Sequence, residues 1–230
     1  MLKFFGRDSA FGHSNNSAFF IDRKDLVLID CPMSSFQKVK FFDFKKFDNV
    51  YVLVTHTHGD HISGIGTFVY FLYFCKKTKL TVVAPNRKLY YTLNILLKDI
   101  EGCDDNKFNI ITGDSLNKKW FVKSILTKHV DSLDCFGYLL NIKDTPVIYT
   151  GDTTTLEPFK DVITDNSYLF TEIAYNNSGV HLYYKEALPT LIQLSEKGVK
   201  VFLMHLDDIE NIKDVIKGTS LELAPLAFPS

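Results

Sequence analysis

Short apolar runs separated by turns and helical segments dominate the hydrophobic pattern of the chain. Runs typical of strands lie at residues 2–5, 17–21, 26–29 and 50–55. The segments "VLID" and "VYVLVT" are almost continuously apolar, as expected of strands that are buried on both faces of a sheet. The N-terminal part of the chain therefore predicts a buried sheet.

The rest of the chain alternates between strand and helix patterns. Further strands are expected at residues 80–84, 109–112, 120–126, 136–142, 146–150, 168–171 and 199–204. Helices are expected from His61 to about Cys75, after Pro85, over 184–196 with Gly198 at the end, and over 209–217. This order, with mostly antiparallel strands, predicts an α+β fold in which two sheets pack face to face with helices outside. A length of 230 residues suits a single domain over residues 1–230.

Composition and charge narrow the function classes. Hydrophobic residues make up 46% of the chain, enough for a large core. A net charge of −1 provides no global basic field for nucleic acid. The N-terminus lacks the apolar run of a signal peptide, and the apolar residues 67–75 are too few to cross a bilayer. The four cysteines form no CxxC pair, and we expect them to be reduced thiols. We therefore expect a cytoplasmic protein with no membrane partner.

The segment "YVLVTHTHGDHISG", residues 51–64, places four metal-ligand side chains directly after a buried strand. His56 and His58 are two residues apart and point the same way in extended backbone. Gly59 allows a sharp turn, after which Asp60 and His61 can face a second point nearby. Imidazole and carboxylate groups are ligands of Zn²⁺-type ions. The segment therefore predicts part of a site for two ions.

One loop cannot saturate two ions, so further ligands are expected at other strand ends. His129 ends "WFVKSILTKH", Asp152 ends "TPVIYTGD" and His205 ends "VKVFLMH". Three distant strands that each finish on a ligand-type residue are expected to complete the site. His13 lies in the glycine-containing first loop, and nothing in the pattern requires it as a ligand.

The motif "THTHGDH", followed in order by His129, by Asp152 in "TGDT" and by His205, resembles the metallo-β-lactamase superfamily. The opening "FFGRDSAFGHSNNSAFFI…LVLIDCP", with Asp30 after an apolar strand, is similar to the opening of that family. The resemblance covers nearly the whole chain. It implies a four-layer αβ/βα sandwich with a two-metal site at one edge of the sheets.

Carried over by position, the resemblance implies two sets of ligands. One ion would be held by His56, His58 and His129, the other by Asp60, His61 and His205, and Asp152 would bridge them. Zn²⁺ is the expected ion, with Mn²⁺ or Fe²⁺ as alternatives for mixed nitrogen and oxygen donors. Two such ions suit the hydrolysis of a carbonyl or phosphoryl centre, and Asp60 is counted as catalytic because it would hold one of them.

The segment between Asp152 and His205 resembles the ribonuclease Z branch of the superfamily. Glu172 in "TEIAY" and His181 in "GVHLYYKEAL" match a Glu–His pair that is implicated there in protonating the leaving oxygen. A carboxylate beside an imidazole fixes its tautomer and raises its pKa, which suits a general acid at neutral pH. The resemblance therefore implies that Glu172 and His181 are catalytic.

Three departures argue against tRNA processing. Ribonuclease Z enzymes carry a tRNA-gripping arm between the positions of His129 and Asp152, where this chain has room for two strands and a turn. Leu182 and Tyr183 follow His181 where the family has Ser and Thr, and the run "HLDDIEN" after the last ligand is acidic. Arm-less relatives include cyclic-nucleotide and cyclic-phosphate phosphodiesterases. We therefore expect a small phosphodiester or nucleotide as the substrate rather than RNA.

Other branches fit less well. Diiron flavoproteins carry a carboxylate at the position of His58, common β-lactamases carry Cys at that of Asp152, and hydroxyacylglutathione hydrolases add a C-terminal domain for which few residues remain. Hydrolysis of a carboxyl ester, thioester or lactone stays open, because the same ligands serve acyl substrates. A metal-binding sensor without catalysis is the least favoured reading. The sequence does not define an oligomeric state, and a homodimer stays open.

Overall fold

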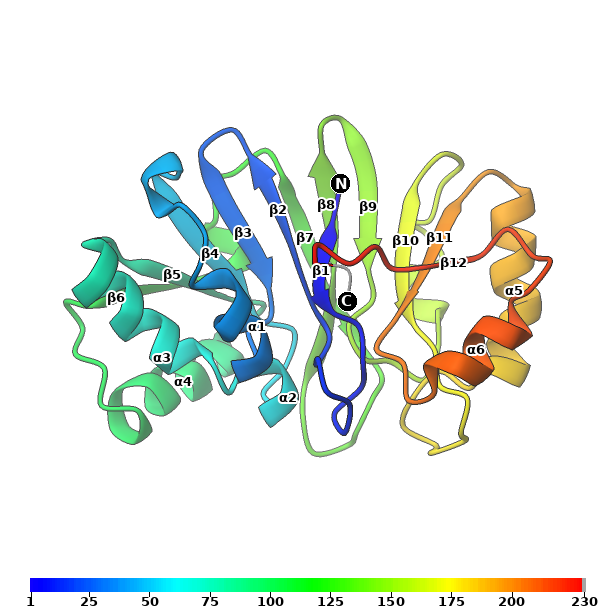
Figure 1. Cartoon of the computed structure of the whole chain (residues 1–230), viewed down its shortest axis with the longest axis horizontal. Coiled ribbons are helices and arrows are strands. Elements are labelled where there is room, and N and C mark those ends of the chain that lie inside the picture. The colour runs from blue at the N-terminus through cyan, green and yellow to red at the C-terminus, as the bar shows by residue number, and fades with distance from the viewer. Residues whose placement is uncertain (229–230) are drawn as a thin grey trace.

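The computed structural model describes residues 1–228, in which twelve strands form two six-stranded sheets (Figure 1). The first sheet contains, in spatial order, β1 (Lys3–Gly6), β2 (Ser17–Asp22), β3 (Asp25–Ile29), β4 (Asn49–Leu53), β5 (Leu80–Ala84) and β6 (Phe108–Thr112). The second contains, in spatial order, β12 (Glu222–Leu223), β11 (Lys200–Met204), β10 (Tyr168–Glu172), β9 (Thr145–Tyr149), β8 (Cys135–Ile142) and β7 (Phe121–Thr127). Each sheet is therefore built from one half of the chain.

Strand directions within each sheet are mixed, which corrects the mostly antiparallel arrangement expected from the sequence. Neighbours from β1 to β3 and from β7 to β9 are antiparallel, whereas neighbours from β3 to β6 and from β9 to β12 are parallel. Parallel neighbours need a long crossover connection, and most of these connections contain a helix. The expectation failed because the direction of strands joined by a crossover depends on packing rather than on local sequence.

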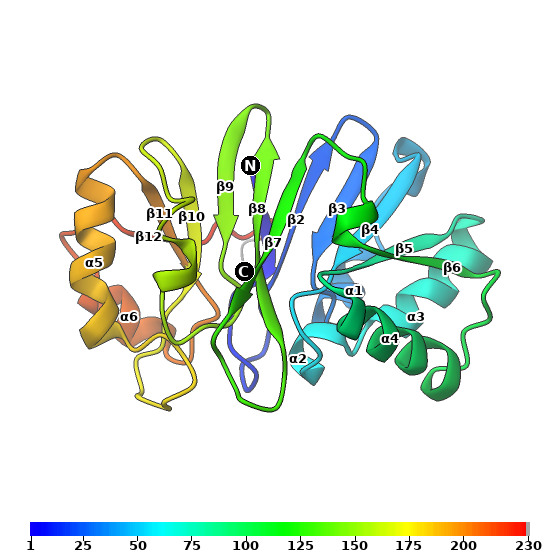
Figure 2. The same ribbon diagram turned by 180° about the vertical axis from the view of Figure 1, so that it is seen from behind.

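Helices cover the outer face of each sheet. The first sheet is covered by α1 (Met33–Val39), α2 (Gly59–Ile62), α3 (Ile65–Tyr70) with a π-helical continuation over Phe71–Lys76, and α4 (Arg87–Ile95) with a continuation over Leu96–Ile100. The second sheet is covered by α5 (Tyr184–Glu196) and α6 (Ile209–Val215). Figure 2 shows the two helical layers on opposite sides of the paired sheets. The four-layer αβ/βα sandwich expected from the sequence is confirmed.

The helix expected from His61 to about Cys75 is interrupted between α2 and α3. Gly64 lies there against the chain that follows β3, and a Cβ atom at this position would lie 2.8 Å from the carbonyl oxygens of both Cys31 and Pro32. This close approach requires glycine and explains the break. The end of the segment faces solvent, because Phe74 and Cys75 are exposed.

The core between the sheets joins residues from both of them. Phe4 and Tyr51 of the first sheet belong to the same buried cluster as Tyr138, Tyr149 and Phe170 of the second. Each sheet also packs against its own helices through one further apolar cluster. The sheets therefore hold one another rigidly, and the strand ends keep fixed positions along their common edge.

Two smaller expectations can also be compared with the structure. Its four cysteines are free thiols, as expected, and three of them are buried. Within residues 1–228, none of the helices has the length and apolar character needed to cross a bilayer.

Candidate metal centre

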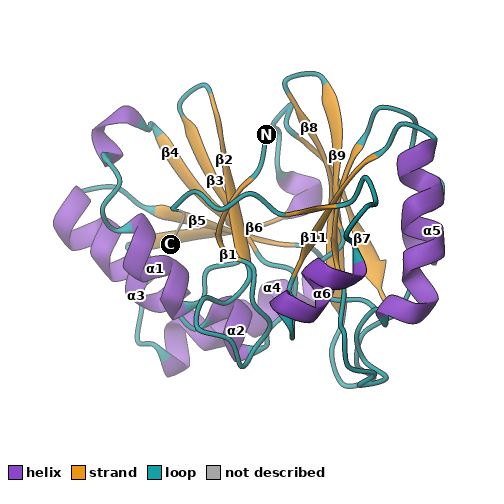
Figure 3. Ribbon diagram, turned by 45° about the vertical axis from the view of Figure 1, so that its right-hand side comes forward, coloured by secondary structure: helices purple, strands orange, loops and turns teal. Residues whose placement is uncertain are grey.

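The candidate ligands gather at one edge of the sandwich because the carboxyl ends of several strands meet there. Strands β3 and β4 are parallel, as are β9, β10 and β11, and β7 runs in the direction of β9 because each is antiparallel to β8. The carboxyl ends of parallel strands are the usual place for a ligand site in such sheets. The loops that extend from these ends gather along one side of the molecule (Figure 3).

One cluster consists of His56, His58 and His129, whose ring nitrogens all lie within 4.8 Å of one another. The Nδ1 atom of His129 donates a hydrogen bond to the carbonyl oxygen of Val180 at 2.6 Å. This bond fixes the ring with Nε2 facing the cluster. Burial and the neighbouring His61 lower the pKa of His56 well below its ordinary value, so that its ring is neutral and can act as a ligand.

A second cluster consists of Asp60, His61 and His205, whose ligand atoms also lie within 4.8 Å of one another. Asp60 Oδ2 lies 3.3 Å from His61 Nε2 and 3.4 Å from His205 Nε2. The short helix α2 positions both Asp60 and His61, and Gly59 at its start is the residue that the sequence marked as a turn.

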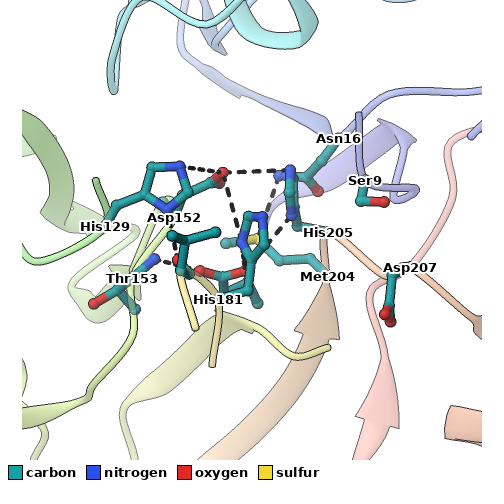
Figure 4. A network of polar contacts seen from close by, with 12 residues as sticks. Ser9, Asn16, His129, Asp152, Thr153, His181, Met204, His205 and Asp207 are labelled. Carbon is teal, nitrogen blue, oxygen red and sulfur yellow. Dashed lines mark hydrogen bonds and ion pairs between the residues drawn. The ribbon is translucent and has the colours of Figure 1, made fainter. Parts of the chain in front are cut away.

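Asp152 lies between the two clusters. Its Oδ2 atom is 3.9 Å from His56 Nε2, 3.7 Å from His129 Nε2 and 3.4 Å from His205 Nε2, and its Oδ1 atom is 3.5 Å from His61 Nε2. Figure 4 shows the Asp152 carboxylate turned toward His129 and His205. The seven side chains expected as ligands are therefore all brought together, in the two groups that the resemblance implied.

Asp30 orients this site from behind, a role that the sequence did not reveal. It is fully buried, and its carboxylate accepts hydrogen bonds from the Thr55 backbone N–H and hydroxyl, each at 2.8 Å, and from His61 Nδ1 at 2.8 Å. The Thr55 hydroxyl donates to Asp30, so it accepts from His56 Nδ1 at 3.0 Å. Both rings consequently turn Nε2 toward the ligand clusters. The available signal was an aspartate at the end of the buried run "VLID".

The electrostatics of the site fit a bound cation. Burial alone would raise the pKa of Asp152, but His205 and His61 outweigh it and hold the pKa well below its ordinary value. Burial alone would lower the pKa of His205, but Asp152, Asp60 and Glu172 raise it to about 10. The buried carboxylates thus draw protons onto neighbouring imidazoles, which is the demand for positive charge that a metal ion would meet.

Unpaired atoms give a second test of the fit. Among the described residues, His61 Nε2, Asp152 Oδ1 and His205 Nδ1 are buried and have no hydrogen-bond partner. Leaving such groups unpaired costs free energy. Their nitrogen and oxygen donors, with those of the other clustered side chains, suit divalent ions such as Zn²⁺. The residues present therefore fit a metal centre.

Glu172 and His181 form a pair at the rim of this centre. His181 Nδ1 donates to Glu172 Oε2 at 2.6 Å, and Glu172 Oε1 accepts from the backbone N–H of Thr153. Glu172 is fully buried, whereas the His181 side chain is 23% exposed. Burial alone would lower the pKa of His181, but the hydrogen bond and charge of Glu172 outweigh it and raise the pKa. Figure 4 shows His181 beside Asp152 and His205.

A cleft of about 730 Å³ opens over the metal centre. One wall is the loop between β1 and β2, with Ser9, Ala10, Phe11 and Gly12, and another is the loop that leads to His181. His13 is exposed and does not line the cleft. The volume lies within the range of roughly 300–1,000 Å³ that is typical of small-molecule sites.

Comparisons with known proteins agree with this arrangement. Residues 1–222 match the sequence profile of the anti-Pycsar protein Apyc1 family. The chain belongs to the Apyc1 family. It is 25% identical to an anti-Pycsar protein Apyc1 of Bacillus phage 010DV004, over 93% of this chain and 90% of that protein. It is also 28% identical to a ribonuclease Z of Clostridioides difficile, over 89% of this chain and 67% of that protein.

The fold of this Apyc1-family chain is also found among solved structures. The metallo-β-lactamase fold protein YhfI of Bacillus subtilis superposes with a TM-score of 0.75 at 18% identity, covering 99% of this chain and 97% of YhfI. The metallo-β-lactamase fold expected from the sequence is thereby confirmed.

Proposed function

We propose that this Apyc1-family protein is a metal-dependent phosphodiesterase that hydrolyses a small phosphodiester, with a nucleotide, and above all a cyclic nucleotide, as the substrate. The observation that carries the proposal is the Glu172–His181 pair at the rim of the ligand clusters, facing a cleft of small-molecule size. An imidazole held by a carboxylate is suited to protonate a leaving oxygen, and an alkoxide leaving group needs that proton.

The ligand assignment is part of the proposal. His56, His58 and His129 would hold one divalent ion, Asp60, His61 and His205 would hold a second, and the carboxylate of Asp152 would be shared between them. When bound, such ions lower the pKa of water from about 15.7 toward neutrality and stabilise negative charge on the phosphoryl group. The proposed ions are Zn²⁺, with Mn²⁺ or Fe²⁺ as alternatives.

The residues of the chain then have distinct tasks. Asp30 and Thr55 orient the rings of His61 and His56, and Val180 orients His129. His181 Nδ1 is occupied by Glu172, so the proton available to a leaving oxygen is the one on His181 Nε2. Glu172 is fixed in turn by the N–H of Thr153, which keeps the imidazole in one orientation.

A small substrate is favoured over RNA by the shape and charge of the surroundings. The interval between His129 and Asp152 is filled by the hairpin of β8 and β9, which turns at Lys143–Asp144, and so contains no arm. Asp207, two residues after His205, lines the cleft, and its acidic side chain disfavours a polyanion. The phage relatives are named anti-Pycsar proteins, and we extend that role to this chain as part of the proposal.

Parallel assays on zinc- or manganese-loaded protein test the proposal. The substrates are 3′,5′-cyclic nucleotides, bis-p-nitrophenyl phosphate, p-nitrophenyl acetate, a homoserine lactone and a precursor tRNA. We expect hydrolysis of the phosphodiesters that is lost on chelation. Faster turnover of the acetate or the lactone would indicate an acyl hydrolase, precise cleavage of the tRNA would indicate a ribonuclease Z, and metal binding without any turnover would indicate a sensor.

A further inference from the structure

Phe11 stands out among the phenylalanines of the chain. It lies at the tip of the loop between β1 and β2, it is fully exposed, with 102% relative accessibility, and it lines the cleft over the metal centre. Single exposed apolar side chains are common and need no explanation by themselves. The position of Phe11 at the mouth of a site, rather than its exposure alone, points to a ligand.

The loop that carries Phe11 is tightly built. The N–H of Asp8 donates to the carbonyl of Ser14 at 3.1 Å, the N–H of Asn16 donates to the carbonyl of Asp8 at 2.9 Å, and the N–H of Ser14 donates to the Asp8 carboxylate at 3.0 Å. The Asn15 side chain donates to the carbonyls of Ser9 and Ala10. The loop therefore closes on itself through side-chain and backbone hydrogen bonds on both sides of its tip.

The same loop is attached to the residue that follows the ligand His205. The N–H of Ser9 donates to the carbonyl of Leu206 at 2.8 Å, and the N–H of Leu206 donates to the carbonyl of Arg7 at 2.8 Å. Gly12 packs so closely that an added Cβ atom would lie 2.2 Å from the Cβ of Asp8. The backbone beside Phe11 is thus held at a fixed place relative to the metal centre. The exposure of the ring is therefore a feature of a well-held loop.

Another part of the cleft lining is polar. Asp207 accepts hydrogen bonds from the backbone N–H groups of Tyr175 and Asn176 at 2.7 and 2.9 Å, and from the Asn176 side-chain amide at 3.0 Å. Asn176 lines the cleft together with Ser178. The lining of the cleft therefore combines an apolar ring, polar groups and the candidate metal ligands.

We propose that Phe11 is the stacking surface for the nucleobase of the substrate, with the phosphodiester at the metal centre. This inference rests on the proposed phosphodiesterase function and makes its substrate a nucleotide. Every nucleobase has an apolar face, which the Phe11 ring would receive, and a polar edge, for which Asn176 and Ser178 are polar partners in the same lining. Stacking on an aromatic ring tolerates different bases, so the cleft is expected to accept more than one nucleotide.

The test compares Phe11→Ala with wild type on two substrates, a 3′,5′-cyclic nucleotide and the matching sugar cyclic phosphate without a base. Removing a stacking ring typically weakens binding by roughly 5- to 150-fold. We expect KM for the nucleotide to rise by that factor, with kcat changed less than about twofold. KM for the base-free substrate should stay unchanged, and Phe11→Trp should restore nucleotide binding.

Phe41→Ala is the matched control. Phe41 is also highly exposed, at 80%, but it lies outside the cleft lining, so its loss should leave both substrates unaffected. Calorimetric titration with a non-hydrolysable cyclic phosphorothioate gives a readout of binding that does not depend on turnover. Thermal unfolding should be unchanged in Phe11→Ala, because its ring makes little contact with the core.

The outcomes separate this inference from the proposed function. If wild type hydrolyses nucleotides and Phe11→Ala has the same KM and the same affinity for the phosphorothioate, stacking is refuted while the phosphodiesterase proposal stands. An equal rise in KM for the base-free substrate would also refute it, because the effect would then concern the phosphate site. Absence of phosphodiester hydrolysis in wild type would overturn the proposed function and this inference with it.

Discussion

His181→Ala gives the most informative perturbation of the proposed chemistry. In the structure His181 Nδ1 is 2.6 Å from Glu172 Oε2, and Glu172 is fully buried and held by the N–H of Thr153. The imidazole is therefore fixed, and its remaining nitrogen is the group that can protonate a leaving oxygen. Removing it should leave the attack on phosphorus intact and impair only the departure of the leaving group.

A positioned general acid contributes about 10²- to 10⁴-fold to a rate, which corresponds to roughly 2.7–5.5 kcal/mol of transition-state free energy. We expect kcat of His181→Ala to fall by that factor on an alkyl phosphodiester, whose alkoxide needs a proton. On bis-p-nitrophenyl phosphate kcat should be nearly the same as in wild type, because p-nitrophenolate leaves without protonation. Glu172→Gln should show the same pattern with a smaller loss, since it disturbs only the orientation and basicity of the ring.

The assay compares the loss of kcat on the alkyl diester with the loss of kcat on the aryl diester. The metal content of each variant is determined in parallel by elemental analysis. Asp60→Ala is the control, because loss of a ligand should reduce both rates together. The His129–Asp152–His181 group also has ligand-like spacing, within 4.8 Å. Equal losses on the two diesters, or a metal ion missing from His181→Ala, would show that His181 is a ligand or a binding residue rather than the acid.

Three further predictions concern the orienting aspartate, the substrate and the stability of the sandwich. Asp30→Ala should weaken metal binding by about 10- to 100-fold in a competition with a chelator, because His61 loses the carboxylate that turns its Nε2 atom toward the site; an unchanged affinity would remove Asp30 from the site. Precursor tRNA should be cleaved poorly at enzyme concentrations that hydrolyse small phosphodiesters, and efficient 3′-end cleavage would contradict the small-substrate proposal. Asp25→Asn should lower the free energy of unfolding at pH 7 by about 1–3 kcal/mol, since Asp25 accepts from Trp120 at 3.0 Å and lies 2.8 Å from Lys118. Burial would raise the pKa of Asp25, but Lys118 and Trp120 outweigh it and lower the pKa. This stabilisation is therefore present above the unfolded value of 3.8 and is lost as pH falls through the lower folded pKa. A difference between wild type and Asp25→Asn that does not shrink as pH falls below 3.8 would contradict it.

The candidate ligands were predictable because most of the ligand-type side chains lie close together in the sequence. Four of the seven occur within six positions, and the others stand at the ends of strands that the apolar pattern had already located. Strand ends in such a sheet meet at one edge, so the sequence was sufficient to expect that His129, Asp152 and His205 would join His56 and His61. The strands expected from the apolar pattern came within two residues of their observed ends, whereas the two-residue strand β12 was not expected.

Features that depend on contacts between distant segments were not predictable. The bond from Asp30 to His61 joins residues 31 positions apart, and nothing in the local pattern connects them. The break at Gly64 arises from the approach of the chain near Cys31, and the parallel pairing of β3 with β4 arises from the crossover between them. The place of Phe11 at the cleft depends on the attachment of its loop to Leu206, almost 200 residues later in the chain.

The central claim is that two metal ions held by these residues support phosphodiester hydrolysis, and a metal titration tests it most directly. Metal-free protein is loaded stepwise with Zn²⁺, and the ions bound per chain, by elemental analysis, are compared with the rate on a 3′,5′-cyclic nucleotide. We predict that the rate reaches its maximum only at about two ions per chain and that Asp152→Ala abolishes it. Full activity at one ion, or a rate that persists in metal-free protein, would contradict the two-metal phosphodiesterase.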